Sequence, residues 1–351
     1  MSDNRKANGR FPVYGANGEK DRTDKFYHDK PSIVVGRKGS AGEINLTENK
    51  FWPLDVTYFV TFDEQQYNLQ FLYYLLVTLE LTKLAKGVKP GINRNEVYSL
   101  TTNVPPLPEQ QRIVDLLDEA FAGLATAKSS AEKNRQNARA TFESHLQSVF
   151  TRQAEEVPLS ELASDITDGD HSPPPKASSG VPFITISDIV KRTREIDFTN
   201  TFTVPEAYFQ NLKPNKKPRV GDVLYTVTGA TLGIPVLVKE QRDFCFQRHI
   251  GLIRPKPDTD SAWLTYALLS PQVFKQATIG STGAAQKTVS LSVLRSLRVP
   301  KVRLLQQKQI VERLNSLSVQ TQHLECLYQQ KLTALDALKK SLLHQAFSGE
   351  L

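Results

Sequence analysis

A helical pattern that occurs twice is the feature that most constrains the fold of this 351-residue chain. Between Glu109 and Phe150, apolar residues recur at steps of four and three, the spacing of one face of a helix. They are Ile113, Leu117, Ala120, Leu124, Ala127, Ala131 and Ala138. The stretch Gln306 to Phe347 repeats this pattern without insertion, because Phe347 follows Phe150 by the same 197 residues that separate its first apolar residue from Ile113. Its apolar residues are Ile310, Leu314, Leu317, Leu324, Tyr328, Leu335, Leu338 and Leu342.

Each copy is long enough to form a rod of roughly 60 Å, at about 1.5 Å of rise per residue. A single apolar face on such a rod is poorly shielded from water, so we predict that the two helices pair as an antiparallel coiled coil within the chain. The predicted interface consists of Ile113, Leu117 and Leu124 on the first helix and Ile310, Leu314, Leu317, Leu324 and Leu335 on the second. The alternative is two unrelated helices buried in ordinary cores, and the ungapped repetition argues against it.

The sequence outside the helices also repeats, which predicts an α+β fold with an internal pseudo-two-fold duplication. We expect a first α/β domain over 1–108, the first long helix over 109–150, a second α/β domain over 151–305 and the second helix over 306–351. In both domains a strand, a glycine-rich turn, a helix and a further loop follow one another in the same order.

The two predicted domains differ at their starts. About 30 residues, Thr151 to Gly180, precede the strand Val181–Ile184 of the second domain, but only Met1 to Arg10 precede the matching strand at Phe11. The first domain is therefore expected to be short at its N-terminal side and to lack a counterpart of 157–166. We expect this difference to make the first domain less stable than the second.

Several classes of protein are disfavoured by what the chain lacks. No window approaches 18 apolar residues and the first residues have no apolar signal-peptide core, so we expect a cytoplasmic protein without a membrane partner. Cys245 and Cys326 are far apart and the six histidines are scattered, so neither a disulfide framework nor a metal site is predicted.

Enzyme motifs are also missing. The loop Gly280 to Thr288 resembles a phosphate-binding loop only loosely, because its glycine and lysine spacing fails. The Asn/Asp-Pro-Pro-aromatic motif of amino-methyltransferases does not occur, since Pro105 follows a valine and Pro173 follows a serine. We therefore expect no catalytic residues, no cofactor and no enzymatic activity in this chain itself.

The positive charge of the chain lies outside the predicted helices. The net charge is +7, whereas 109–150 carries five Lys/Arg against six Asp/Glu and 306–351 carries five against four. The helices together are thus neutral, and the whole excess belongs to the two domains. A basic surface there fits nucleic acid, because phosphate contacts supply much of the affinity for DNA. A pI near 9.2 alone is also common among proteins that never touch DNA.

Candidate DNA contacts come from glycine turns and basic loops. In the first domain they are Arg37, Lys38, Ser40, Lys86, Lys89, Asn93 and Arg94, and in the second they are Thr226, Thr228, Gln286, Lys287 and Thr288. Arginine can bond guanine through two N–H groups, and lysine can contact a base edge or a phosphate. The alternatives are glycines that only permit tight turns and basic side chains that are only solvated. Arg248 and His249 are interpreted as a pair at the edge of the core.

Several motifs in this order resemble the DNA-specificity subunits of type I restriction-modification systems. The resemblance rests on 34–42 (VVGRKGSAG), 51–55 (FWPLD), 105–114 (PPLPEQQRIV) and 341–351 (SLLHQAFSGEL), together with the duplication and the long helices. It implies two target-recognition domains that each read one half of a bipartite double-stranded DNA site. It also implies that the helices bind two methyltransferase subunits and that nuclease-translocase subunits join the complex.

A second hypothesis remains open from the residues themselves, namely a coiled-coil scaffold whose domains bind other proteins without DNA specificity. The confinement of the basic excess to the domains favours DNA binding. The glycine turns also differ, because Gly229 to Gly233 carries no basic residue where the first domain has Arg37 and Lys38. Unlike turns would suit unlike half-sites.

Overall fold

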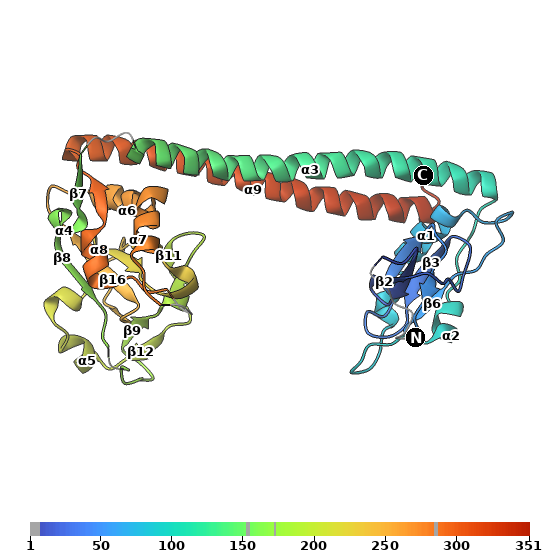
Figure 1. Ribbon diagram of the computed structural model, residues 1–351, viewed down its shortest axis with the longest axis horizontal. Coiled ribbons are helices and arrows are strands. Elements are labelled where there is room, and N and C mark those ends of the chain that lie inside the picture. Colours follow the sequence, from blue (N-terminus) through green and yellow to red (C-terminus); the bar gives the residue numbers. More distant parts are fainter. Residues whose placement is uncertain (1–7, 152–154, 172, 284–286) are drawn as a thin grey trace. The chain divides into compact units, whose positions relative to one another are not determined.

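The computed structural model describes residues 8–151, 155–171, 173–283 and 287–351. The chain divides into two compact units, which are treated separately below. The first unit combines Met1–Lys133 with Tyr328–Leu351, and the second unit is Asn134–Leu327. Each unit therefore contains one globular block and one half of each long helix (Figure 1).

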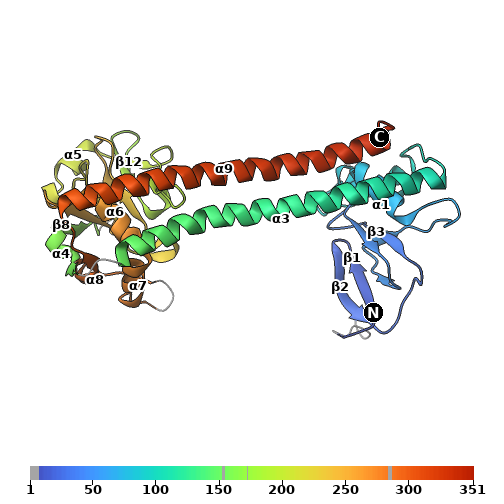
Figure 2. The same ribbon diagram turned by 90° about the horizontal axis from the view of Figure 1, so that it is seen from above.

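The two long helices are α3 (Leu107–Thr151) and α9 (Leu304–Ser348), each of 45 residues. Both begin two residues before the predicted start. They run side by side in opposite directions, because Ile113 packs in one cluster with Leu343 in the first unit, and Leu146 packs in one cluster with Leu314 in the second (Figure 2). The predicted antiparallel helix pair is therefore confirmed.

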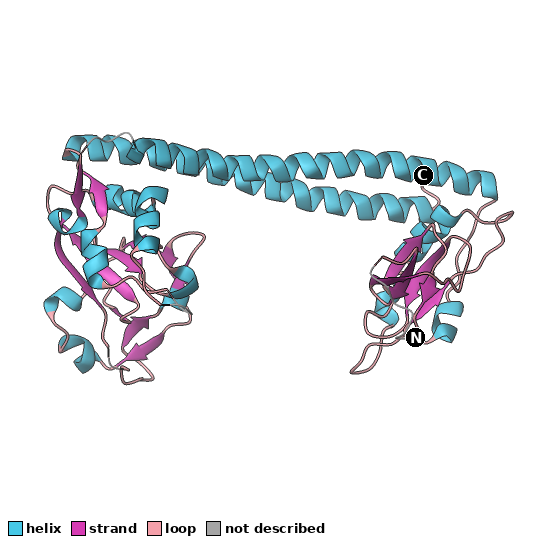
Figure 3. Ribbon diagram, viewed as in Figure 1, coloured by secondary structure: helices cyan, strands magenta, loops and turns pink. Residues whose placement is uncertain are grey.

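The block of the first unit is built on two small sheets (Figure 3). One has the order β2-β1-β5 and the other β4-β3-β6. The strands are β1 (Phe11–Gly15), β2 (Gly18–Thr23), β3 (Ser32–Gly36), β4 (Ile44–Thr47), β5 (Trp52–Pro53) and β6 (Thr57–Phe59). The helices are α1 (Leu69–Thr78), the 3₁₀ helix η2 (Leu81–Leu84) and α2 (Arg94–Tyr98). Strand β3 is central because its β-branched residues are buried on both faces.

The second unit has sheets of order β12-β9-β15 and β14-β13-β16-β8, with the pairs β17-β7 and β10-β11. Its strands are β7 (Glu156–Pro158), β8 (Ala163–Asp168), β9 (Val181–Ile184), β10 (Ile189–Val190), β11 (Glu195–Ile196), β12 (Phe202–Val204), β13 (Val223–Thr226), β14 (Pro235–Leu237), β15 (Cys245–Phe246), β16 (Ile250–Pro255) and β17 (Arg298–Pro300). Its helices are α4 (Leu159–Leu162), η3 (Ile186–Asp188), α5 (Glu206–Gln210), η4 (Pro214–Lys216), η5 (Gly229–Thr231), α6 (Ser261–Leu269), α7 (Pro271–Ile279) and α8 (Leu291–Ser296).

The strand orders of the two blocks correspond, which confirms the predicted duplication. The order β2-β1-β5 matches β12-β9-β15, and in both sheets the central strand pairs antiparallel on one side and parallel on the other. The order β4-β3-β6 matches β14-β13-β16. Among the described residues, only the second unit adds the fourth strand β8 and the pair β17-β7.

Each block packs on the long helices through one of its own helices. In the first unit, α1 contributes Phe71, Tyr74 and Leu75 to a cluster with residues from the start of α3 and the end of α9. In the second unit, α6 contributes Trp263, Leu264, Ala267 and Leu268 to a cluster with the start of α9 and the end of α3. Equivalent aromatic contacts occur in the two units. The ring centroids of Phe71 and Phe347 are 5.1 Å apart, and those of Trp263 and Phe150 are 6.1 Å apart.

The buried face of the helix pair contains fewer residues than the predicted interface. On α3 the buried residues Leu117, Leu124, Ala131 and Ala138 follow one another at seven-residue steps. On α9 only Leu314 and Thr321 of the corresponding row are fully buried, and the predicted residues Ile310, Leu317 and Leu335 are half-buried. Leu324 and Leu338 are 41% and 47% exposed, so they do not belong to the buried row. The small alanines opposite this part of α9 shield less surface than leucines would.

Candidate nucleic-acid interface

In the first unit, the turn after β3 lies against a hairpin formed by Lys86 to Gly91. The amide of Gly39 donates to Pro90 O at 2.9 Å, and the amide of Ile92 donates to Arg37 O at 3.0 Å. Lys86 and Gly91 exchange two backbone hydrogen bonds of 3.0 Å, which close the hairpin. Gly39 has a φ of +85°, a value that favours glycine, and nothing lies within 4 Å of the position its Cβ would take. The two predicted loops of this domain therefore form one surface.

The second unit contains the same arrangement. The amide of Gly229 donates to Lys287 O at 3.2 Å, and the amide of Val289 donates to Val227 O at 2.8 Å. Thr282 and Thr288 exchange two backbone hydrogen bonds of 2.8 and 2.9 Å, as Lys86 and Gly91 do in the first unit. We call these two surfaces the turn–hairpin surfaces. The first comprises 37–42 and 86–92, and the second comprises 227–233 with the described residues of 282–289.

The first turn–hairpin surface presents basic side chains. Lys38 and Lys89 are exposed, and the half-buried Arg37 places its guanidinium 5.6 Å from the centre of the Tyr58 ring, a cation–π contact that orients it. Ser40 is half-buried within the turn. The surface thus presents two exposed lysines that can reach phosphates, and one arginine whose guanidinium is oriented by Tyr58.

The other three predicted residues of the first domain have local partners. Lys86 Nζ lies 2.6 Å from Glu96 Oε1, and the Arg94 guanidinium lies 5.7 Å from the centre of the Tyr98 ring. Asn93 caps α2, because its Oδ1 accepts from the Asn95 amide at 2.9 Å. All three are exposed, but the acceptor atom of Asn93 serves the helix.

The second turn–hairpin surface is less basic, and two of its predicted threonines are buried. Thr226 is 1% exposed, and its Oγ1 donates to Thr231 O and accepts from the Ile234 amide, so its role is to hold the turn. This structural role replaces the DNA contact that we expected. Thr228 is 3% exposed, which leaves its hydroxyl out of reach of a partner in this conformation. Lys287 is exposed and Thr288 is half-buried, whereas Gln286 lies outside the described residues.

Sequence reasoning missed Arg248 and His249 as neighbours of this surface. His249 O accepts from the Val227 amide at 2.9 Å, just as Val56 O accepts from the Arg37 amide at 2.8 Å in the first unit. Arg248 is exposed, and its Nε lies 3.4 Å from His249 Nε2. Burial and the Arg248 charge both lower the pKa of His249. The duplication is the signal that could have identified the pair, because His249 takes the place of Val56, whose carbonyl oxygen meets the first turn.

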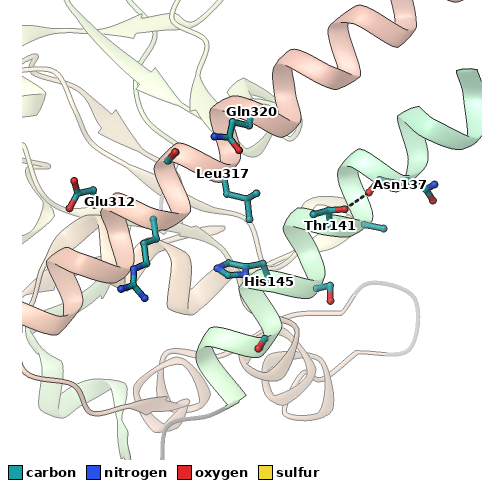
Figure 4. A pocket seen from close by; sticks show the side chains of 11 residues that line it. Asn137, Thr141, His145, Glu312, Leu317 and Gln320 are labelled. Atoms are coloured by element: carbon teal, nitrogen blue, oxygen red, sulfur yellow. Dashed lines mark hydrogen bonds between the residues drawn. The ribbon is translucent and has the colours of Figure 1, made fainter.

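A groove lies between α3 and α9 within the second unit (Figure 4). It has a volume of about 1210 Å³ and is lined mostly by small and polar side chains. Its lining includes Asn137, Thr141 and His145 of α3 and Glu312, Leu317 and Gln320 of α9. The helices are therefore not closely packed along this part of their length.

Across the described ranges, no group of three or more His, Cys, Asp or Glu residues is placed to hold a metal ion. In the same part of the chain, no helix is both long enough and apolar enough to cross a bilayer.

Two similar α/β blocks and an antiparallel helix pair define the class of fold, and comparison with known proteins gives the family. The model of the type I restriction modification DNA specificity domain matches residues 1–133 and 158–333. The chain therefore belongs to this family. As a member it is a non-catalytic specificity component of a restriction-modification system.

Several relatives are similar at low identity. The EcoBI specificity subunit of Escherichia coli is 23% identical over 321 residues, which cover 82% of this chain and 67% of that protein. A Mycoplasma pneumoniae protein assigned as a type I specificity subunit is 23% identical over 296 residues, covering 80% of this chain and 75% of that one. A Haemophilus influenzae protein of the same assignment is 25% identical over 122 residues, and the match spans only 31% of its length.

Two solved structures share the fold. The HsdS subunit of Thermoanaerobacter tengcongensis superposes with a TM-score of 0.62 at 20% identity, covering 99% of this chain and 94% of that one. A chain from a study of complex assembly and conformational transition of the type I R-M system gives a TM-score of 0.78 at 20% identity, covering 97% and 92%. At these identities the likeness establishes the architecture alone.

Proposed function

We propose that each unit reads one half of a bipartite double-stranded DNA target through its turn–hairpin surface. The observation that carries this proposal is that one backbone arrangement occurs in both units with different side chains. A shared arrangement suits the same task, and different side chains suit different base sequences. The domain boundaries 1–108, 109–150, 151–305 and 306–351 remain part of this proposal.

The contacts that we assign differ between the half-sites. In the first unit, Arg37 and Lys38 are the candidates for reading base edges, while Lys86, Lys89 and Arg94 supply phosphate contacts. Ser40 and Asn93 add hydrogen-bonding groups beside them. In the second unit, Lys287, Thr288, Gln286 and the newly found Arg248 take these roles. The smaller number of cations there predicts a weaker salt dependence for the second half-site.

The helix pair is proposed to set the spacing between the half-sites. A helix of 45 residues is about 68 Å long at about 1.5 Å per residue, a length that corresponds to about 20 base pairs at about 3.4 Å each. The pair is held by short side chains and by ion pairs rather than by a wide apolar seam. A stiff connection of fixed length would make the spacer between half-sites invariant.

The same helices are proposed to dock two methyltransferase subunits, with nuclease-translocase subunits completing the complex. The groove of the second unit supports this, because small side chains such as Ala140, Ser144 and Ser316 leave room for a partner helix. DNA modification by such a complex would take place in the cytoplasm. Neither a metal nor a cofactor of this chain is needed for the proposed role.

The experiment has two parts. The complex of this chain with its methyltransferase is first used to map the DNA sequence that becomes methylated, and its affinity for that sequence is then measured by titration. We expect one bipartite motif to be methylated, and we expect affinity for it to fall steeply with salt. Binding that is independent of salt and of sequence, with methylation unaltered when the chain is omitted, would favour the protein-binding scaffold instead.

A further inference from the structure

Among the described residues, only the second unit carries a hairpin inserted between two strands of its three-stranded sheet. In the first unit, Ala16 and Asn17 alone connect β1 to β2. In the second unit, residues 185–201 connect the matching strands β9 and β12 and contain η3 and the hairpin β10–β11, which Figure 1 shows at the edge of the block. Since the sheet forms in the first unit without this insertion, the fold does not require it. The insertion is therefore available for a task of the second unit.

The base of the insertion is fixed to the block. The amide of Thr185 donates to Asp188 Oδ2 at 2.7 Å and so closes η3. Ile189 of β10 is buried in the cluster that contains Phe244. Phe198 packs on the same cluster, and its ring centroid is 5.6 Å from that of Phe244. The hairpin thus grows out of the core, and its tip, residues 191–194, has a defined place.

The tip is strongly basic. It consists of Lys191, Arg192, Thr193 and Arg194, so it has three cations and no acidic residue. The amide of Arg194 donates to Val190 O at 2.8 Å, which closes the turn. Lys191, Arg192 and Thr193 are exposed, and within the described part of the chain the side chains of Lys191 and Arg192 form no hydrogen bond or ion pair. Like charges this close repel one another, and a bound anion relieves the repulsion.

Arg194 is held in a conformation and an environment that both disfavour it. Its φ is +56°, in the left-handed region where glycine is favoured because a Cβ is strained there. Its side chain is half-buried, and no carboxylate of the described ranges pairs with it. Burial lowers the pKa of Arg194, and the nearby Tyr266 phenol only partly opposes this shift. A half-buried guanidinium without a counter-charge is stabilised when an anion binds it.

Double-stranded DNA is the anion that fits this tip. The phosphates of a duplex are closely spaced charges, which match several cations on one turn better than a single carboxylate does. An arginine guanidinium can bond phosphate oxygens through two parallel N–H groups. The second turn–hairpin surface also has fewer cations than the first, so a further phosphate contact would supply affinity that it lacks.

We propose that the hairpin tip 191–194 binds the phosphate backbone of double-stranded DNA and positions the second unit on its half-site. This inference rests on the function proposed above and adds to it a contact that reads no bases. Arg194 bonds one phosphate, and Lys191 and Arg192 reach neighbouring phosphates. The tip therefore contributes affinity and salt dependence, whereas the turn–hairpin surface selects the base sequence.

Binding of the full-length protein to two duplexes tests the tip across a range of salt concentrations. One duplex carries the sequence that the complex methylates, and the other is a random sequence of the same length. Replacing Lys191, Arg192 and Arg194 together by alanine should reduce the slope of log affinity against log salt by about 2–3 on both duplexes, since each phosphate contact contributes about 0.9. The ratio of the two affinities should stay within about twofold of the wild-type ratio.

The matched control combines Lys213→Ala, Arg219→Ala and Arg303→Ala. It also removes one lysine and two arginines, from exposed positions of the same unit, and should leave the slope unchanged. Arg194→Gly separates binding from folding, because glycine accepts the positive φ. Its melting temperature should not fall, whereas its affinity for both duplexes should fall by about threefold or more.

Three results would contradict the proposal. A lower melting temperature of Arg194→Gly with unchanged DNA affinity would show that Arg194 is structural. Equal slopes for the triple tip variant and the wild type would overturn the tip contact alone and leave the proposed function intact, and loss of the methyltransferase from that variant would then make the tip a protein contact. Wild-type binding without salt or sequence dependence would overturn the proposed function and this inference together.

Discussion

Gln110 and Gln307, separated by 197 residues, make the same three hydrogen bonds in the two units. Each is 1% exposed and donates through its side-chain amide to two backbone carbonyl oxygens. The Oε1 of Gln110 accepts from the amide of Asn68 at 2.8 Å, and that of Gln307 accepts from the amide of Asp260 at 2.6 Å. Since Asn68 and Asp260 cap α1 and α6, these glutamines connect each block to its long helix.

Gln110→Ala is expected to destabilise the first unit by about 3 kcal/mol, because it leaves buried backbone groups without partners. The same loss is expected in the second unit from Gln307→Ala. Gln111→Ala is the matched control, since Gln111 is exposed, and it should cost less than about 1 kcal/mol. Denaturant unfolding monitored by hydrogen exchange would assign each loss of stability to its unit. Equal losses for Gln110→Ala and Gln111→Ala would contradict the structural role.

Two ion pairs between the long helices occur at positions related by the 197-residue repeat, with the basic and acidic residues exchanged. Lys128 pairs with Asp336 in the first unit, and Arg139 lies 3.6 Å from Glu325 in the second. The 197-residue offset aligns Lys128 with Glu325 and Arg139 with Asp336. Two copies of α3 paired in this register would bring Lys128 against Arg139. The charges therefore favour pairing of α3 with α9 over pairing of like helices.

A double-mutant cycle measures this preference. For Lys128→Ala with Asp336→Ala we expect a coupling of about 0.2–1 kcal/mol, because both side chains are partly exposed. The coupling should shrink in high salt. A coupling of zero at low ionic strength would show that the pair does not contribute to helix pairing.

The long helices and the duplication could be predicted because periodic spacing survives in a single sequence. Burial at individual positions could not. Leu324 fits the four-three pattern but is exposed, since burial also depends on the side chains of the opposite helix. Thr226 stands in a glycine-rich turn typical of ligand contacts, yet its hydroxyl satisfies the turn itself. Only the folded chain brings Arg248 and His249 beside Val227.

The two thiols should differ in reactivity. Burial raises the pKa of the Cys245 thiol to about 12, so that the thiolate is scarce at neutral pH, whereas Cys326 is exposed on α9. We expect an alkylating reagent at pH 8 to modify one thiol per native chain, at Cys326, and two after denaturation. Mass spectrometry of the labelled peptides gives the answer, and rapid native labelling of Cys245 would contradict its burial.

The half-sites can be tested by single substitutions. Lys38→Ala should weaken binding through the first half-site and Lys287→Ala through the second, each by about 1–3 kcal/mol if a base contact is lost. Lys133→Ala removes the same charge from an exposed position on α3 and serves as the control. Affinities for targets altered in one half at a time would separate the effects. Equal losses on cognate and random DNA would reduce both lysines to phosphate contacts.

The most direct test of the central claim is to shorten both helices and measure the spacer that the complex then methylates. Deleting Ala125–Ala131 together with Gln322–Tyr328 removes one heptad from each helix and keeps the buried rows in phase. The helices shorten by about 10 Å, close to three base pairs of about 3.4 Å. We predict methylation of a target with a shorter spacer, or loss of methylation because the second groove has rotated. Methylation of the original target at wild-type efficiency would contradict the account.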